Sequence, residues 1–538
     1  MKRWLAASFV LFGCIPAAPE GACYLDEHCP TDLACVDGLC MTPPSSSDDG
    51  PTIPDDIKLD VEGGVPEIPS TCASATAIRT NAGCEFWAAD LPNAWKPSSP
   101  FGFDIAANQQ FAVVVANVSE SEAAMVSVYS GGSGSAIATA EVAPLSTHTF
   151  ELPAQSLSPT QNGAGVGYRI ASDVPITAYQ FQPLDNLVPV YSNDASALLP
   201  AHVLENDYLA VTSDVLSLTL YSSDSFEEGN YDSGAYVTAI ATADDTHVVF
   251  YPTAALAEGS IEDIVLARGE TFTILSKIPD GTEPGDPYGN LSGTRVIADK
   301  PIALFSGNVV GVEPRDNTEC CADHLEHQML PLVAWGASYI CAPPPLPANT
   351  NEDAPASYRI TAAFDGTQLS WGGEQPAGAP SVLDANETAV FTTSKPVMVA
   401  SDPAHPIAVT QFLLNAGQNP GNSEYGDPGM IAQPALSQLQ TRYVFLAPNG
   451  YRSNVVTVVA PTGADVQLDG QTISQWRQLP DFQGSGWGFA HVDIEPGAHV
   501  LIADQPASID VYGYDSYVSY AYAGGSAVEI ISEAPPIP

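Results

Sequence analysis

From about residue 72 onward, short apolar runs alternate with polar turn residues along the chain. The runs are rich in Val, Ile, Thr, Tyr and Phe, as in "FAVVVANV" from residue 111, and Gly, Pro, Asp and Asn separate them. No long stretch shows the 3.6-residue period of an amphipathic helix. Short runs of β-branched and aromatic residues between turn residues are typical of antiparallel strands. The pattern therefore predicts an all-β protein.

The same order of runs recurs four times, over about residues 111–181, 236–307, 358–412 and 454–525. Each copy opens with two strands around a polar turn, continues with a hairpin, and ends in a strand that is entered through a proline. A residue without an N–H group is tolerated where a strand begins, and the prolines concerned are Pro175, Pro301, Pro396 and Pro506. Five or six strands in about 100 residues predict tandem antiparallel β-sandwich-like repeats. A ring like a β-propeller is the alternative, because four similar units could close on themselves.

The N-terminus has the pattern of an export signal. Two basic residues, Lys2 and Arg3, precede an apolar run that is too short to span a bilayer. The run ends in "LFGC", which resembles the lipobox of bacterial lipoproteins and would place a lipid on Cys14 after cleavage of residues 1–13. In those lipoproteins Ile after the cysteine favours the outer membrane, so we expect an exported protein that is anchored there by lipid. Ordinary cleavage near Ala17–Ala18 is the alternative.

Residues 14–40 form a small cysteine-rich segment, followed by a linker. Four cysteines are spaced C-x5-C-x5-C-x4-C, and so short a segment needs crosslinks to hold a shape. We predict a disulfide module paired Cys23–Cys35 and Cys29–Cys40, with a zinc knot as the alternative. Residues 41–71 are rich in Pro, Ser, Asp and Gly, which predicts a flexible tether. The all-β region then occupies residues 72–530.

The charge of the chain limits its partners. The sequence has 63 acidic and only 16 basic residues, for a net charge of −47. Nucleic-acid binding requires clustered Lys and Arg, so the composition predicts no nucleic-acid partner. An anionic membrane surface would also repel the chain, and we therefore expect membrane attachment through the lipid alone. Such a surface charge keeps an exported protein soluble.

The segment "NTECCADHLEHQMLP", residues 317–331, holds the densest set of reactive side chains. In an oxidising compartment we expect one of its two cysteines to bridge to Cys341. A zinc site from Cys321, His324 and His327 is an alternative, and a nucleophilic thiol is another. The disulfide candidates of the whole chain are Cys23, Cys29, Cys35, Cys40, Cys72, Cys84, Cys320, Cys321 and Cys341.

Common enzyme motifs are absent from the sequence. We find no G-x-S-x-G, H-E-x-x-H, Walker or Rossmann pattern. No catalytic residue and no cofactor are therefore predicted. The tyrosines of "YGYDSYVSYAYAGG", residues 512–525, could form a ligand-facing patch, or they could fill the interior of a last strand.

Several motifs in order resemble one known family, the N-terminal domain of the IgGFc-binding protein, which also occurs in bacterial surface lipoproteins. They are "GCEFWAADLPNAW" from residue 83, "SGTRVIADKPIALFSGN" from 292, "CCADHLEHQMLPLVAWGASYICAP" from 320, "YRITAAFDGT" from 358 and "YGYDSYVSYAYAGG" from 512. In the third motif, the residues that match in kind are Cys321, Asp323, His324, Leu325, Gln328, Pro331, Trp335 and Gly336. His327 stands where the family tends to have Glu, and Ala322 is an extra residue.

The resemblance implies an extracellular binding or adhesive module without catalytic activity. We therefore predict a lipid-anchored bacterial cell-surface protein that binds an extracellular protein or glycan. A structural envelope or matrix protein is the first alternative. A metal-dependent hydrolase centred on His324 and His327 is the second.

Overall fold

The computed structural model describes two compact units, Met1–Gly63 and Gly64–Pro538. Its described residues are 34–36, 39–41, 69–93, 106–154, 157, 161–184, 192–215, 217–221, 228–232, 234–277, 289–314, 322–421 and 424–536. In the first unit these residues form one hairpin, β1 (Ala34–Val36) with β2 (Leu39–Met41). The predicted signal peptide, the lipidation site and nearly all of the predicted linker lie outside the described residues. No helix among the described residues is long and apolar enough to cross a membrane.

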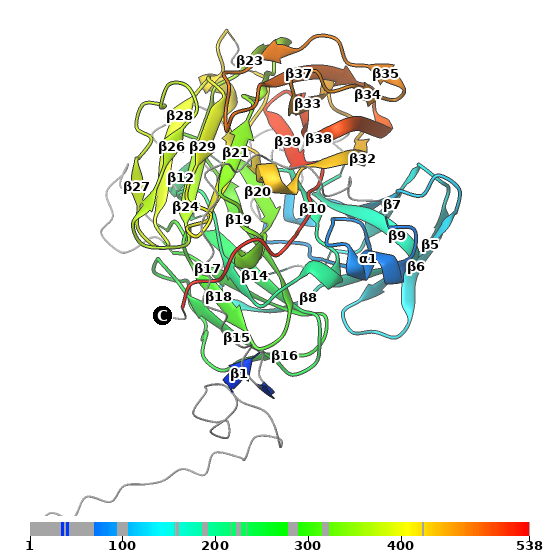
Figure 1. The fold of residues 1–538 in the computed structure, drawn as a ribbon. Coiled ribbons are helices and arrows are strands. Elements are labelled where there is room, and N and C mark those ends of the chain that lie inside the picture. Colours follow the sequence, from blue (N-terminus) through cyan, green and yellow to red (C-terminus); the bar gives the residue numbers. More distant parts are fainter. Residues whose placement is uncertain are drawn as a thin grey trace, which may run out of the picture. The chain divides into compact units, whose positions relative to one another are not determined.

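The second unit is all-β, as predicted, and contains four modules in chain order (Figure 1). The first module is β3 (Gly83–Ala88), β4 (Phe111–Asn117), β5 (Ala124–Ser130), β6 (Ala136–Val142), β7 (Thr147–Leu152), β9 (Tyr168–Gln182) and β10 (Asp194–Leu198). The second is β11 (Asp207–Leu209), β14 (Ala235–Ala241), β15 (Thr246–Tyr251), β16 (Ile264–Leu266), β17 (Glu270–Leu275), β18 (Arg295–Ala298), β19 (Ile302–Gly311) and β20 (Asp323–Gln328).

The third and fourth modules repeat this order. The third is β21 (Ser338–Cys341), β24 (Ala356–Ala362), β25 (Thr367–Gln368), β26 (Ser370–Trp371), β27 (Val382–Leu383), β28 (Thr388–Thr393), β29 (Val397–Ala400), β30 (Ile407–Leu413) and β31 (Met430–Ala432). The fourth is β32 (Gln440–Ala447), β33 (Ser453–Pro461), β34 (Val466–Leu468), β35 (Gln471–Thr472), β36 (Arg477–Gln478), β37 (Trp487–Ile494), β38 (Gly497–Asp515) and β39 (Val518–Ala523).

Further short elements connect or decorate the modules. Outside the modules, β8 (Gly163–Val166) pairs with β17, and two hairpins are β12 (Ser217–Tyr221) with β13 (Glu228–Asp232) and β22 (Pro345–Leu346) with β23 (Asn349–Asp353). The helices are α1 (Cys72–Ala77), η2 (Ala106–Asn108), η3 (Ala201–Val203), η4 (Leu332–Ala334), η5 (Ala416–Gln418) and η6 (Leu436–Gln438). α1, η3, η4 and η6 each stand directly before the entering strand of a module.

Each module is a small two-layered sandwich. In the second module, one sheet has the order β20-β19-β14-β17-β8 and the other the order β11-β18-β15-β16. Side chains along β15 alternate between buried and exposed, so its buried face packs on the first sheet. In the first and fourth modules, the long strands β9 and β38 pair with strands of both layers. The predicted sandwich-like repeats are therefore confirmed.

The positions predicted for the prolines are only partly correct, since Pro175 and Pro506 lie inside β9 and β38 instead of opening a strand. In the third repeat, the strand that ends the predicted range is β30, which pairs with β24 and is preceded by Pro406. Pro396 precedes β29, which belongs to the other layer of the module. Two prolines ten residues apart both precede β-branched runs. The local sequence therefore could not show which proline precedes the strand of which layer.

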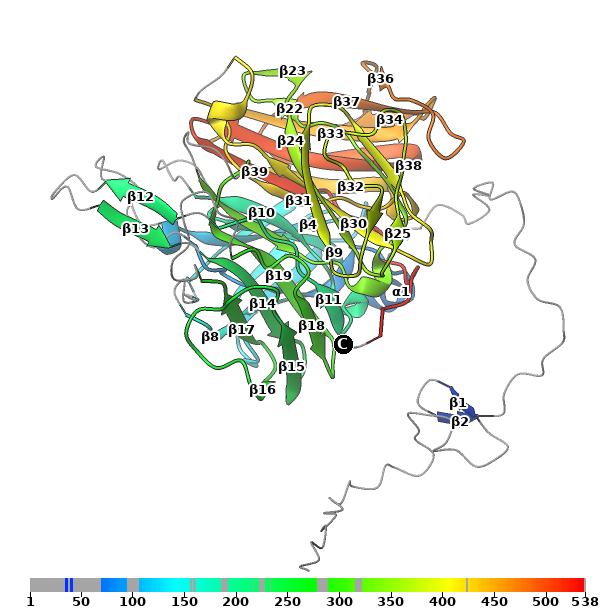
Figure 2. The same ribbon diagram turned by 90° about the vertical axis from the view of Figure 1, so that its left-hand side faces the viewer.

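The last strand of each module, here called its exit strand, faces the exit strands of its neighbours. β10 contacts β20 and β39, and β31 contacts the same two strands. The four exit strands thus form a closed circle, and the four modules, coloured in sequence, surround it in Figures 1 and 2. The units are therefore sandwiches and not the single-sheet blades of a β-propeller, although the contacts among their exit strands arrange them in a ring.

The two ends of this unit close the ring on each other. Thr80 lies opposite Ala527 in an antiparallel bridge. Asn81 N–H donates to Ser526 O at 3.0 Å, and Val528 N–H donates to Arg79 O at 2.6 Å. The segment from residue 526 onward thereby joins the fourth module to the start of the first.

Candidate binding site

The predicted cysteine sites fall into three groups. Cys14, Cys23, Cys29, Cys320 and Cys321 lie outside the described residues. Cys35 and Cys40 lie opposite each other in the β1–β2 hairpin, but the pairing predicted for their thiols stays a prediction.

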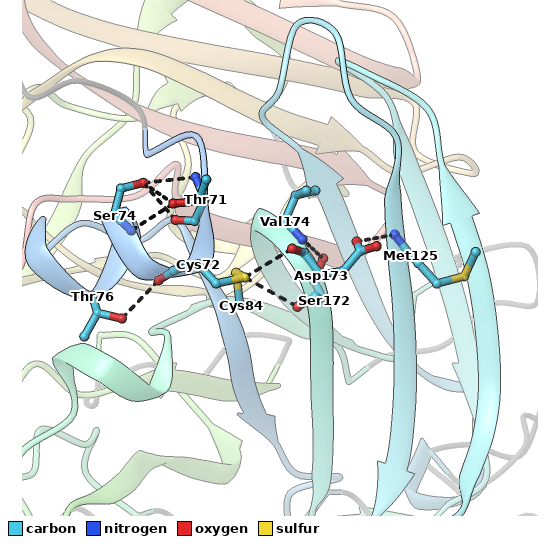
Figure 3. The surroundings of a disulfide bond; sticks show 9 residues. All are labelled: Thr71, Cys72, Ser74, Thr76, Cys84, Met125, Ser172, Asp173 and Val174. Atoms are coloured by element: carbon cyan, nitrogen blue, oxygen red, sulfur yellow. Dashed lines mark hydrogen bonds between the residues drawn. A yellow bond between two sulfur atoms is a disulfide. The ribbon is translucent and has the colours of Figure 1, made fainter.

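Cys72 and Cys84 form a disulfide bond, which joins α1 to β3 (Figure 3). Helix α1 begins at a capping box, because the Thr71 hydroxyl accepts from Ser74 N–H and Ser74 Oγ accepts from Thr71 N–H. The Cys72 sulfur lies 3.4 Å from the carbonyl oxygen of Asp173 on β9. The crosslink therefore fastens the start of the second unit to its first module.

The predicted bridge to Cys341 is not formed in this structure. Cys341 is a free, buried thiol at the end of β21, and it packs in the hydrophobic core of the third module beside Tyr339 and Tyr358. Burial raises the pKa of this thiol well above its ordinary value. β20, which follows the vicinal cysteines in the chain, pairs with β19 in a sheet of the second module. Cys341 thus lies in the core of the third module without a disulfide, while its predicted partners Cys320 and Cys321 lie outside the described residues.

His324 and His327 do not share a site. Both lie on β20, where side chains three positions apart point to opposite faces of the strand. His324 stacks on Tyr236 with 5.9 Å between the ring centroids. Burial lowers the pKa of His324 to about 3 and that of His327 to about 4, so both rings are neutral. The two histidines of the zinc alternative therefore lie on opposite faces of the strand.

One carboxylate missed by the sequence analysis connects all four exit strands. Asp194, at the start of β10, accepts hydrogen bonds from the backbone N–H groups of Ala195, Glu326, Met430 and Ala521 at 2.9–3.3 Å. These donors belong to β10, β20, β31 and β39. Burial raises the pKa of Asp194, and the four N–H donors oppose that shift. The only sequence signal was a charged residue next to the buried run "ASALLP".

Four of the five tyrosines in residues 512–525 are interior residues, and Tyr517 is partly exposed. Tyr512, Tyr514, Tyr520 and Tyr522 are at most 2% exposed on β38 and β39. Tyr522 donates to Leu446 O at 2.5 Å and Tyr520 to Asn454 Oδ1 at 2.8 Å. The proposal of a ligand-facing tyrosine patch is therefore wrong, and the alternative of a filled last strand is correct.

A groove of about 560 Å3 lies on the fourth module. Its walls are the β34–β35 hairpin with the segment that follows, the end of β37, and the turn into β38. The apolar lining residues are Leu468, Ile473, Val492 and Ile494, of which Leu468 and Ile473 are buried. The polar lining consists of Asn351, Asp469, Gln471, Thr472, Ser474, Gln475, His491, Asp493, Glu495 and His499. The volume lies in the range of ligand-binding sites, and the lining is more polar than that of most small-molecule pockets.

The groove is acidic. Three carboxylates line it, Asp469, Asp493 and Glu495, and no Lys or Arg is among its lining residues. The carboxylate of Asp493 accepts from Thr350 Oγ1 at 2.7 Å, and all three carboxylates belong to exposed residues. The groove therefore suits a ligand that offers positive charge or hydrogen-bond donors.

Its two histidines are held by neighbouring groups. His499 lies between Asp469 Oδ2, at 2.7 Å, and the carbonyl of Glu495, at 2.6 Å. His491 contacts Thr457 Oγ1 at 2.8 Å and Asp353 Oδ1 at 3.1 Å. Burial lowers the pKa of His491, although the contact with Asp353 opposes the shift. The groove is thus preorganised by contacts within the chain.

Comparison with known proteins places this fold in a family. The human IgGFc-binding protein is 24% identical over 256 residues, which are 46% of this chain and 4% of the human protein. The chain thus spans only a small part of the length of this relative. Residues 194–513 match the family described as IgGFc binding protein, and the match begins at Asp194 and includes the groove. Because the match covers more than half of the sequence, the chain belongs to the IgGFc-binding protein family.

Proposed function

We propose that this protein is an exported binding protein whose ligand occupies the groove of the fourth module. The single observation that carries the proposal is the acidic, preorganised groove of about 560 Å3 in a member of this family. The relative's name refers to the Fc part of IgG, so an extracellular protein is the first class of ligand to consider. The ligand would place a basic, polar segment against the three carboxylates. Binding, and not catalysis, would be the activity.

The lipid anchor is the second part of the proposal. The "LFGC" sequence supports lipidation of Cys14, and the Pro-, Ser- and Asp-rich residues 41–71 would hold the ring away from an outer membrane. The acidic body would be repelled by anionic lipid headgroups, so it would remain available to ligands. The protein would then act in adhesion or capture at a bacterial cell surface.

Binding is tested by surface plasmon resonance with the full chain. Human IgG Fc and fractions of secreted proteins and glycoproteins are the probes, each with and without prior removal of glycans. For any probe that binds, Asp493→Asn with Glu495→Gln should weaken affinity at least tenfold, because two of the three groove carboxylates are lost. The matched control Asp481→Asn with Glu529→Gln removes two exposed acids outside the groove lining and should bind like the natural chain.

If the groove variant binds as well as the natural chain, the groove is not the ligand site. If no probe binds, the alternative of a structural envelope protein is favoured. Loss of binding after glycan removal would identify a glycan as the ligand instead of a protein segment. Anchoring is tested separately, since Cys14→Ser should release the protein from the membrane fraction. Unchanged membrane attachment of that variant would contradict the lipid anchor.

A further inference from the structure

A second layer of polar residues lies beside Asp194 at the centre of the ring. Asp194 binds the backbone of Glu326, Met430 and Ala521. On or just before each of these strands, and β10 itself, a further polar residue lies one to three positions before the residue that contacts Asp194. These residues are Asn193, Asp323, Asp427 and Ser519, and each is 0–1% exposed.

Hydrogen bonds show that these residues are neighbours. Asn193 N–H donates to Asp323 Oδ1 at 2.5 Å, which brings the start of β10 against the start of β20. Asp427 N–H donates to Ser519 Oγ at 2.7 Å, which joins the approach to β31 with β39. The Asn193 side chain donates from Nδ2 to the hydroxyl of Tyr451. The second layer therefore involves all four modules, as the Asp194 layer does.

Four oxygen atoms in this layer have no hydrogen-bond partner. They are Asp323 Oδ2, both carboxylate oxygens of Asp427, and the amide oxygen Asn193 Oδ1. A buried carboxylate without a partner is costly, because it has lost its hydration. Among the described residues, no Lys or Arg forms an ion pair with either aspartate. No basic side chain among the described residues therefore compensates these oxygens.

The two aspartates also act on each other. Burial raises the pKa of Asp323, and the nearby charges of Asp427 and Asp194 raise it further. Burial likewise raises the pKa of Asp427. Two such carboxylates cannot both be ionised unless a proton or a cation lies with them. One shared proton would pair only two of the four unpaired oxygens, whereas a cation between the two aspartates would compensate both carboxylates.

The donor set indicates which cation would fit. All four atoms are oxygens from carboxylates and an amide, the ligands that Ca2+ prefers. Two carboxylates balance the charge of a divalent ion. No group of three or more His, Cys, Asp or Glu side chains in the described parts of the chain is placed to hold a metal. A cation at this place would therefore bind two carboxylates and, as a third ligand, the unpaired amide oxygen of Asn193. No calcium-loop motif in the sequence predicted this site.

We propose that Asp323, Asp427 and Asn193 bind one divalent cation, Ca2+, at the centre of the ring. The cation would join residues of the first, second and third modules, next to the strand of the fourth. It would stabilise the junction of the exit strands in an extracellular medium that contains calcium. The proposal is independent of the ligand of the groove.

The test is calcium titration calorimetry on the full chain in about 0.15 M salt, after treatment with a chelator. We expect one site whose affinity for calcium is well above that of the acidic surface. Asp427→Asn should reduce the affinity of that site at least tenfold, and the exposed control Asp481→Asn should leave it unchanged. In chelator, Asp427→Asn should unfold at a higher temperature than the natural chain, since it removes a repelled charge. With calcium present, the natural chain should unfold at a higher temperature than Asp427→Asn.

A second measurement uses the natural chain only, in case the variant does not fold. Terbium(III) takes calcium sites, and tyrosine within a few ångströms sensitises its luminescence. Since Tyr451 contacts Asn193, bound terbium should emit under tyrosine excitation, and calcium should displace it stoichiometrically. Weak binding without a distinct site, or a site that Asp427→Asn leaves intact, would overturn the proposal and favour a shared proton.

Discussion

Tyr208, Tyr339 and Tyr443 make the same two contacts in three successive modules. Each hydroxyl accepts from a backbone N–H three residues earlier, at 3.0–3.2 Å. Each donates to the carbonyl of the residue that follows a proline, on β19, β30 or β38, at 2.6–2.8 Å. The tyrosine thus joins the entry of a module to the strand that precedes its exit strand. Because the contacts depend on residues about 65 to 95 positions apart, a single sequence could not predict them.

Replacing Tyr443 by Phe should destabilise the fourth module. The change leaves the N–H of Gln440 and the carbonyl of Ala507 without this partner, and a lost buried hydrogen bond costs about 1–3 kcal/mol. The free energy of unfolding in urea should fall by that amount. Tyr251→Phe, at a residue that is 37% exposed, is the control and should have little effect. Equal stability of Tyr443→Phe and the natural chain would show that this contact is unimportant.

Asp510 should make stability depend on pH. Burial raises the pKa of this carboxyl from 3.8 to about 7, against a hydrogen bond from Gln433 that lowers it. Between these two values the folded chain holds a proton that the unfolded chain has lost, so the free energy of unfolding falls as pH rises from about 4 to about 7. At about 1.4 kcal/mol per pKa unit, the effect is on the order of 4 kcal/mol.

Asp510→Asn should remove this contribution, because the amide does not titrate. The stability of the variant relative to the natural chain should therefore increase as pH rises from 4.5 to 7 and then stay constant. Urea unfolding at several pH values measures the difference, with Asp481→Asn as a control that keeps the natural pH dependence. A difference that does not vary with pH would mean that Asp510 is ionised in the folded chain.

Among the strands, exposed hairpins could be predicted from the sequence pattern, whereas the exit strands could not. The pattern in β15 alternates because one face meets solvent. β20, with the sequence "DHLEHQ", is polar but entirely buried, since neighbouring exit strands cover it on the side where an ordinary module would meet water. A polar, fully buried strand has the composition of an exposed loop. This is why the sequence analysis interpreted the segment as a reactive site.

The disulfide between Cys72 and Cys84 should stabilise the junction of α1 and β3. Its sequence separation is 12 residues, and closing a loop of that size in the unfolded chain contributes about 3 kcal/mol. Replacing both cysteines by Ser should lower the free energy of unfolding by roughly that amount. Reductant should destabilise the natural chain and leave the double variant unchanged. Equal stability of the two proteins would show that packing alone holds α1.

Ring closure in the whole molecule uses contacts between residues far apart in the chain, and no local sequence pattern contains such contacts. The repeat pattern in the sequence predicted four similar units, and the structure confirms sandwich-like modules. Their closure depends on buried polar residues, Asp194 above all, and on the pairing of residues 79–81 with 526–528. These pairs are far apart in the sequence, so neither composition nor periodicity reveals them. The groove on the fourth module could not be predicted for the same reason.

Removal of residues 526–538 should open the ring where the two ends of the second unit pair. Asn81 N–H would lose its acceptor on Ser526, and the carbonyl of Arg79 would lose the N–H of Val528. Hydrogen exchange at residues 79–83 should become at least about tenfold faster, whereas β24 in the third module should keep its protection. Unchanged exchange at residues 79–83 would show that the ring does not depend on this pairing.

Hydrogen exchange of the full chain, alone and with a saturating amount of whichever extracellular probe binds, measures whether the proposed groove of the fourth module is the ligand site. We expect slower exchange in residues 468–475 and 491–499, which contain most of the groove lining, and unchanged exchange in β15 and β16. Protection confined to another module, with none at the groove, would show that the ligand binds elsewhere.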